Sequence, residues 1–269
     1  MRDPDVTLGL AVLVVLAVVG GAWYFRGELL PQPEQPAVAP PEPAVVEAAV
    51  DDGPKHPVTP LDSTEPVRRD LIPLPPLDDS DSYFLAAVVD ILGANIEALL
   101  VKEALIDKFV ATVDNLPRDH VAEKIRPAER LSERFRVDVA GSDGPTYLSP
   151  DNYQRYDPLV MNVASADIDA IVDTYRRFYP LFQKSYERLG YPNRYFNDRV
   201  VEVIDHLLTT PPQPDEPIKL VRPHVLYEFA DPRLEALSSG RKLLLRMGPE
   251  HAATVRRFLQ DLRSELARQ

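Results

Sequence analysis

The sequence predicts a mainly α-helical protein with one N-terminal transmembrane helix, a disordered proline-rich linker and a multi-helix globular domain with a minor β element. Three observations lead to this fold class. An apolar run covers residues 6–25, 13 of the 28 prolines lie between Pro31 and Pro76, and apolar side chains then recur at three- and four-residue steps. The expected organisation is a short tail at 1–5, a transmembrane helix at 6–25, a linker at 26–70 and a helical domain of unknown function at 71–269.

The apolar run reads VTLGLAVLVVLAVVGGAWYF and is long enough for a membrane-spanning helix. Twenty residues at the helical rise span about 30 Å, which matches the hydrocarbon core of a bilayer. Trp23 and Tyr24 lie where aromatic side chains meet the membrane interface. The alternative is a signal peptide cleaved at the small residues 19–21. Two acidic side chains before the run, and the length of the run itself, argue against cleavage.

A short tail, one anchor and a long C-terminal part form the layout of a signal-anchor protein. The positive charges do not decide the orientation, because Arg2 and Arg26 flank the apolar run equally. We therefore expect a single-pass protein of the bacterial inner membrane, anchored by residues 6–25, with its C-terminal domain in the periplasm. The opposite orientation stays open.

Most of the net charge of −12 belongs to the linker. Residues 27–81 hold twelve acidic and three basic side chains, whereas residues 82–269 carry a net charge of −3. Prolines remove amide donors and the acids repel one another, so we expect disorder with polyproline II character at 26–70. A nearly neutral domain lacks the basic surface of nucleic-acid-binding proteins, and we expect no nucleic-acid partner.

The first half of the domain is expected to form two helices and an irregular stretch. The first helix has Ser80 as its N-cap and ends at a glycine, and the second runs from about 96 to 116 before a proline. Alternating apolar residues at 135–139 predict one short strand. A serine followed by proline opens a short helix at 149–156.

The second half is expected to be helical with one β element. Ser165 is the expected N-cap of a long helix that closes at Gly190 and kinks near 176–177, because Pro180 lies inside it. The remaining elements are a helix from about 197 to 210, two short strands at 218–220 and 225–229 that suit a hairpin, a short helix capped by Asp231 and Pro232, a helix at 240–247 and a last helix from Pro249.

No complete catalytic or cofactor motif is present, so we expect no enzyme activity, no cofactor and no metal site. The chain has no cysteine, which excludes disulfides, thiolate nucleophiles and cysteine-ligated metals. Glu202 and His206 lie four residues apart, a spacing that suits two metal ligands on one helical face. A third ligand is not supplied nearby in the sequence, and a solvated polar face is the favoured interpretation.

A candidate binding surface combines aromatic and basic residues. Eight of the eleven tyrosines lie between Tyr147 and Tyr195, interleaved with arginines, and three of them, Tyr175, Tyr179 and Tyr186, fit a helical core stripe. Tyr153 and Tyr156, which lie on the short helix with Arg155, fit the core pattern least well. The basic residues of the helix at 240–247 suit a carboxylate or phosphate, or they cap carbonyls and pair with acids of the domain. The candidate surface residues are Arg155, Tyr156, Lys242 and Arg246.

Several segments resemble domain-of-unknown-function family 3014, whose members are membrane-anchored proteins of Gram-negative bacteria. These segments are LPPLDDSD at 74–81, FVATVDNLP at 109–117, RY at 155–156 and KLLLRMGP at 242–249. The resemblance covers roughly residues 70–268. It implies an uncharacterised envelope protein with one anchor and a helical domain, and it implies no activity, ligand or catalytic residue.

Three functions are open at this point. The favoured one is a non-enzymatic interaction or scaffold protein, whose tethered domain binds an envelope protein partner. The alternative is a module that binds cell-wall sugar or peptide through the four candidate residues. The third is a hydrolase whose carboxylates are brought together by folding, which sequence spacing does not reveal.

Overall fold

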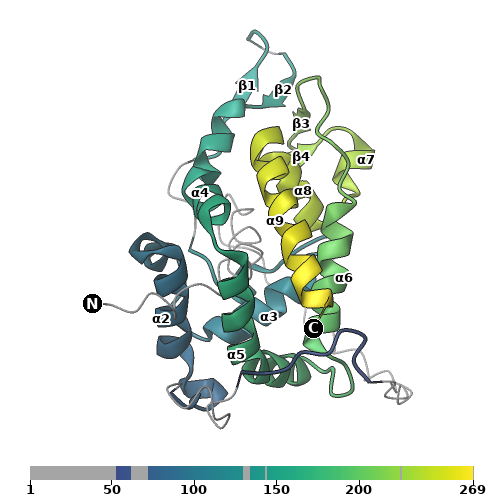
Figure 1. Ribbon diagram of the computed structural model, residues 1–269. Helices are drawn as coiled ribbons and strands as arrows, with labels where there is room; N and C mark the ends of the chain where they lie inside the picture. Colours follow the sequence, from purple (N-terminus) through teal and green to yellow (C-terminus); the bar gives the residue numbers. More distant parts are fainter. Residues whose placement is uncertain (1–52, 62–71, 130–133, 143, 225, 269) are drawn as a thin grey trace, which may run out of the picture.

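The computed structural model describes residues 53–61, 72–129, 134–142, 144–224 and 226–268. This part of the chain is mainly helical and carries a small antiparallel four-stranded sheet (Figure 1). The predicted tail, the predicted transmembrane helix at 6–25 and most of the predicted linker lie outside the described residues. None of the described helices has the length and apolar composition needed to cross a bilayer.

The first helices differ from the prediction in one respect. The elements are η1 at Leu77–Asp79, α2 at Asp81–Leu92, η2 at Ala94–Leu99, α3 at Leu105–Asn115 and η3 at Glu123–Ile125. Helix α2 follows Ser80 as predicted, although the Ser80 hydroxyl donates to the Leu77 carbonyl and does not cap. The prediction of a single helix at about 96–116 is wrong, because the chain is non-helical between η2 and α3.

Two long-range contacts explain this break. The backbone at Leu100 pairs with Ala128, which takes main-chain bonds away from a helix. The Asp81 carboxylate accepts the N–H groups of Ala104 at 2.8 Å and of Leu105 at 2.7 Å. These N–H groups stand at the start of α3, where a helix has no internal acceptors. A side chain from α2 therefore fixes where α3 begins.

The remaining helices follow the prediction more closely. They are η4 at Pro150–Tyr156, α4 at Asp157–Ser165, α5 at Ile168–Arg188, α6 at Phe196–Leu208, α7 at Pro232–Glu235, α8 at Ser239–Arg246 and α9 at Pro249–Ala267. Helix α4 was not predicted. Ser165 is its last residue, and the N-cap of α5 is instead Asp167, whose carboxylate accepts the Asp169 N–H at 3.0 Å. Asp231 caps α7 as predicted.

The sheet joins two segments that are far apart in the sequence. Its strands are β1 at Val137–Val139, β2 at Thr146–Leu148, β3 at Lys219–Val221 and β4 at Glu228–Phe229, in the order β1-β2-β3-β4. The expected β3–β4 pair is confirmed, and β2 was missed. One face packs on α8 in a small core of Leu148, Ile218, Leu220, Phe229 and Leu245.

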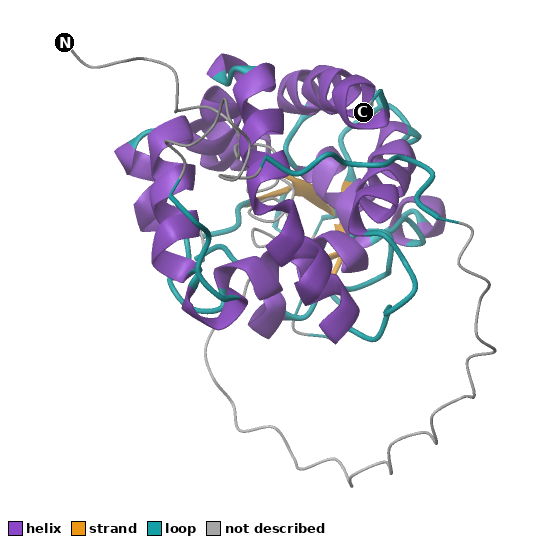
Figure 2. Cartoon of the chain, turned by 60° about the horizontal axis from the view of Figure 1, so that its bottom comes forward, coloured by secondary structure: helices purple, strands orange, loops and turns teal. Residues whose placement is uncertain are grey.

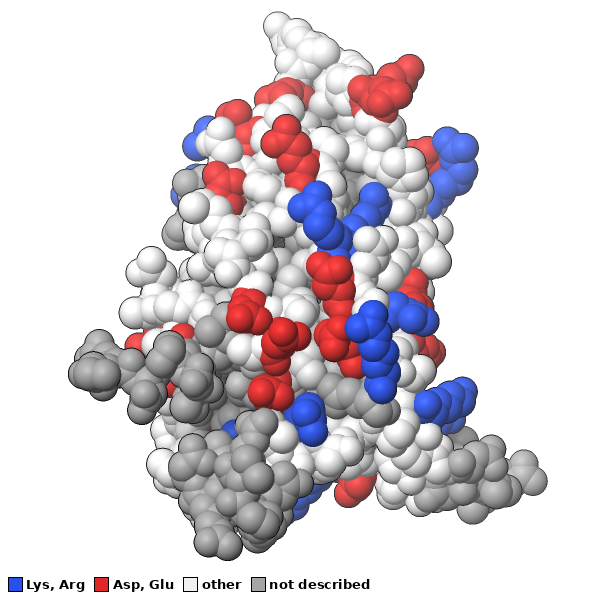
Figure 3. All heavy atoms as spheres, in the orientation of Figure 1, with Lys and Arg blue, Asp and Glu red and all other residues white. Residues whose placement is uncertain are grey.

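The main core is formed by α2, α3, α4, α5, α6, α8 and α9, and a cluster of aromatic rings lies among α2, α3, α5 and α6. Phe182 of α5 is fully buried, and its ring centroid lies 5.5 Å from Phe84 of α2, 5.3 Å from Phe109 of α3 and 6.0 Å from Phe196 of α6. Figure 2 shows the helices gathered around one another with the strands among them. On the face of the described residues seen in Figure 3, acidic and basic side chains are interspersed.

The free energy of unfolding of the Asp81→Ala variant should be about 1 kcal/mol lower than that of the wild type, because two N–H groups at the start of α3 lose their acceptor. Urea denaturation followed by circular dichroism measures the difference. Asp90→Ala is the matched control, since Asp90 is an exposed acid on the same helix. Equal losses in both variants would refute this account of α3.

Candidate peptide-binding groove

The four candidate surface residues meet in the structure, but they are buried. Arg155, Tyr156, Lys242 and Arg246 are 7%, 2%, 5% and 7% exposed. Lys242 donates to a Glu235 carboxylate oxygen at 2.7 Å. This ion pair agrees with the interpretation in which the basic residues pair with acids of the domain, and a binding role of the four residues stays a prediction. Polar groups of other elements bind these residues in the interior, as Glu235 of α7 binds Lys242.

This burial shifts the pKa values of Arg246 and Tyr156. Burial lowers the pKa of Arg246 to about 10, and the nearby Tyr156 and Glu235 act in the opposite direction. Burial raises the pKa of Tyr156, while the charges of Arg155 and Arg246 lower it. The Arg246 guanidinium also lies 5.0 Å from the ring centroid of Phe229 and donates to the Tyr227 carbonyl at 3.3 Å. This cluster joins η4, α8 and the sheet.

Glu202 and His206 have separate partners. Glu202 forms an ion pair with Arg199 at 2.9 Å, and His206 Nε2 lies 2.8 Å from the Ser238 hydroxyl. Within the described part of the chain, no group of three or more histidine, aspartate or glutamate residues is placed to hold a metal ion. The pair thus belongs to a polar face that α8 partly covers.

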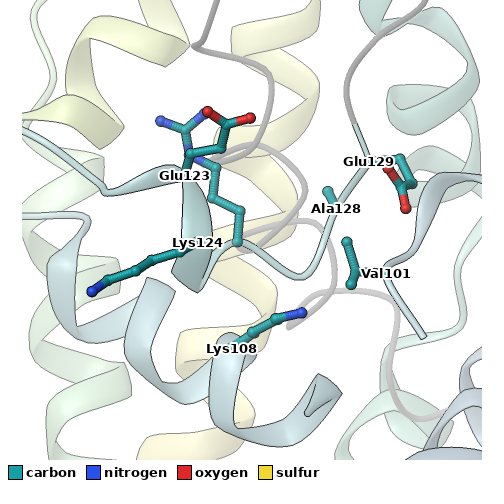
Figure 4. Close-up of a pocket in the computed structure, with 7 residues that line it drawn as sticks. Val101, Lys108, Glu123, Lys124, Ala128 and Glu129 are labelled. Atoms are coloured by element: carbon teal, nitrogen blue, oxygen red, sulfur yellow. The ribbon is translucent and has the colours of Figure 1, made fainter. Parts of the chain in front are cut away.

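One hollow of about 290 Å³ lies beside the start of α3 and η3 (Figure 4). Figure 4 shows Lys108 reaching from α3 toward Val101, while Lys124 points away. The charged residues that line the hollow are Lys108, Glu123, Lys124, Arg126 and Glu129. Its mixed charges do not favour one class of ligand, and none of the four candidate residues lines it.

A more specific arrangement holds residues 53–61, which we call the strap. The strap lies within the range expected to be a disordered linker, and that expectation is wrong for these nine residues. It runs as the dark blue segment beneath α5 and α6 at the bottom of Figure 1. We call the surface that holds it the groove, and Arg176, Asn197 and Asp198 are its polar residues.

The start of α6 binds the first part of the strap. The Asp198 carboxylate accepts the N–H of Lys55 at 2.9 Å and the N–H of His56 at 2.7 Å. The Asn197 amide donates to the His56 carbonyl at 2.9 Å and to the Leu266 carbonyl at 3.2 Å. Asn197 is fully buried, so it ties the strap to α6 and to the end of α9 at once.

Helix α5 binds the second part of the strap, and Pro180 explains how. Proline has no N–H, so the carbonyl four residues earlier, that of Arg176, loses its helical donor. The Leu61 N–H donates to this carbonyl at 3.4 Å, and Arg176 Nε donates to the Thr59 carbonyl at 2.9 Å. The helix is continuous through Pro180. The position where a kink was expected is thus a docking point for the strap.

The groove recognises mainly the backbone of the strap. All of the strap atoms in these bonds belong to the main chain, at Lys55, His56, Thr59 and Leu61. Leu61 is buried and Val58 packs against the main core, which adds two apolar anchors. Prolines occupy every third position, 54, 57 and 60, between the bonding residues. Three residues per turn is also the period of polyproline II.

Two buried phenols, those of Tyr175 and Tyr179, lie close enough to Asp198 for its charge to act on them. Burial raises the pKa of Tyr179 to about 12, and a hydrogen bond from the Asn197 backbone opposes this, while the charge of Asp198 adds to it. Burial also raises the pKa of Tyr175 well above its usual value. Both phenols are therefore uncharged at neutral pH, so Asp198 attracts amide donors without competition from a second anion among these groups.

Sequence reasoning missed Arg176, Asn197 and Asp198. Two signals pointed to the groove. One is the proline spacing of three in the strap, and the other is Pro180 inside a helix, which frees one carbonyl. Nothing in the sequence links these two signals, because Thr59 of the strap and Arg176, whose carbonyl Pro180 frees, are 117 residues apart.

The Asp198→Ala variant should release the first part of the strap, because two amides lose a charged acceptor worth about 1.5–3 kcal/mol each. Hydrogen exchange followed by mass spectrometry should show faster exchange at Lys55 and His56 than in the wild type. Asp261→Ala is the matched control, an exposed acid on α9. Unchanged exchange at both amides in Asp198→Ala would contradict the assignment.

His206 should make the fold sensitive to acid. Burial, together with the charges of Arg241 and Arg199, lowers its pKa below the ordinary value of 6.5. Because the folded-state pKa is depressed, its contribution is present above the unfolded-state pKa and is lost as the pH falls through the folded-state pKa. When the pH falls from about 7 to about 5, the free energy of unfolding should therefore decrease less in His206→Gln than in the wild type.

Urea unfolding midpoints at the two pH values measure this effect. His120→Gln is the control, since His120 is exposed. A wild-type pH dependence retained in full by His206→Gln would refute the prediction.

Comparison with known proteins places most of the domain in a family. A family model described as "Protein of unknown function (DUF3014)" matches residues 105–263, from the start of α3 into α9. No curated protein and no solved structure matches the chain. The resemblance seen in the sequence segments is confirmed. Since the match covers more than half of its length, the chain belongs to the DUF3014 family of proteins of unknown function.

Proposed function

We propose that this protein is a non-enzymatic interaction protein whose domain binds extended peptide segments of a partner in the groove. One observation carries the proposal. The groove already holds a non-helical segment, the strap, through its main chain. Main-chain bonds tolerate many side chains, and apolar pockets at fixed positions then give selectivity. A groove of this kind suits other extended peptides of similar length.

The proposal includes the membrane arrangement. Residues 6–25 anchor the chain in the inner membrane as a single-pass helix, and a disordered stretch at 26–52 carries the domain into the periplasm. The apolar run and the proline-rich acidic composition support this arrangement. The partner is then an envelope protein with an accessible extended segment.

The alternative functions have less support. A module for cell-wall sugar or peptide was expected to use Arg155, Tyr156, Lys242 and Arg246, and all four are buried. A hydrolase with two carboxylates needs paired acids in a cleft. Among the described residues Asp114 is the buried acid, and its carboxylate accepts bonds from Arg199 at 2.9 Å and from Arg118 at 2.9 Å. This carboxylate is neutralised by its partners.

Site-specific photo-crosslinking in cells tests the proposal. A benzophenone side chain replaces Asp173, which lies on α5 beside Arg176 and pairs with it at 3.7 Å. We expect adducts with a partner protein that weaken severalfold when Asp198→Ala is added. The control position is Met161, which is 69% exposed on α4. Adducts that are the same at both positions, or that survive Asp198→Ala unchanged, would sink the proposal.

A further inference from the structure

We infer that the strap is an internal competitor for the groove, and that the partner peptide carries prolines at every third position with free amides between them. This inference deepens the proposed function and rests on it. The strap itself supplies the ligand pattern, with prolines at 54, 57 and 60 and bonding amides at Lys55, His56 and Leu61. A partner peptide that displaces the strap reproduces these bonds in the same places.

The strap fits the groove imperfectly, which favours exchange. Asn197 is fully buried, yet no donor among the described residues lies within bonding distance of its side-chain oxygen. The buried phenol oxygen of Tyr175 also has no hydrogen-bond partner among the described residues. A buried polar atom without a partner costs about 1–3 kcal/mol. A peptide that offers Asn197 one more donor therefore binds more favourably, contact for contact, than the strap does.

Covalent attachment compensates for the imperfect fit. A segment that is joined to its binding site through a short linker has an effective concentration on the order of millimolar. The strap reaches residue 72, where the described domain resumes, through ten residues, so it keeps the groove filled when no partner is near. An external peptide then binds with an apparent affinity that is reduced by the fraction of molecules whose groove is open.

Displacement of the strap also changes the reach of the domain. With the strap bound, the tether between the predicted anchor and the domain is residues 26–52; with the strap released, it is residues 26–71. At about 3.1 Å per residue, the greatest distance that these stretches can bridge is about 84 Å and about 143 Å. Partner binding therefore lengthens the tether while it fills the groove.

The test uses the full-length chain in lipid nanodiscs and a fluorescein-labelled peptide with the sequence of residues 50–64 as the probe. The double variant Lys55→Pro and His56→Pro removes both amides that Asp198 accepts and leaves the groove unchanged. Fluorescence anisotropy should show that this variant binds the probe at least about tenfold more tightly than the wild type. Adding Asp198→Ala to the double variant should abolish the gain.

Two further variants complete the design. Leu61→Ser weakens the strap through its apolar anchor and should also tighten probe binding. Ala48→Pro with Ala49→Pro is the matched control, because it adds two prolines to the linker outside the strap, and it should bind as the wild type does. Equal affinity in all variants would overturn the competitor role and leave the groove function standing. Absence of probe binding in both strap variants would overturn the groove function as well.

Discussion

The structure depends on the burial of one ring, that of Phe182. Phe84, Phe109 and Phe196 surround it at centroid distances of 6.0 Å or less, so a single side chain of α5 holds α2, α3 and α6 together. Such aromatic pairs add about 0.5–1.5 kcal/mol each beyond the burial of their area. Phe196 is also the first residue of α6. The packing of the core thus decides where the next two residues, Asn197 and Asp198, are presented to the strap.

Pro180 gives helix α5 a second role, as a binding site for the strap. Inside a helix, proline removes one main-chain bond and is unfavourable by about 3 kcal/mol. Here the freed carbonyl of Arg176 accepts the Leu61 N–H, so the strap restores part of the lost bonding. Two residues further along, Phe182 buries its ring in the core. Helix α5 therefore anchors the domain on one face and offers an acceptor to an extended chain at Arg176.

A feature could be predicted when the residues that determine it lie close together in the sequence. Gly93, Asp231 and Pro249 mark helix ends through bonds within a few residues, and the prediction at each was confirmed. The start of α3 depends on Asp81, which lies 24 residues earlier in the sequence than Leu105, and there the prediction was wrong. Lys242 was expected either to bind a ligand or to pair with an acid of the domain, and the sequence did not identify Glu235 as its partner. The groove was missed for the same reason, since its two halves lie on distant segments.

The chemistry of the strap contacts sets a rule of specificity for the groove. Proline cannot donate a hydrogen bond, so a peptide that reaches Asp198 and the Arg176 carbonyl needs other residues at the places of Lys55, His56 and Leu61. Prolines between these places limit the freedom of the unbound peptide and so reduce the entropy lost on binding. An uninterrupted proline run lacks the donors, and a glycine-rich run loses too much entropy. The groove therefore selects a spacing of prolines, together with an apolar side chain at the place of Leu61, more than it selects overall composition.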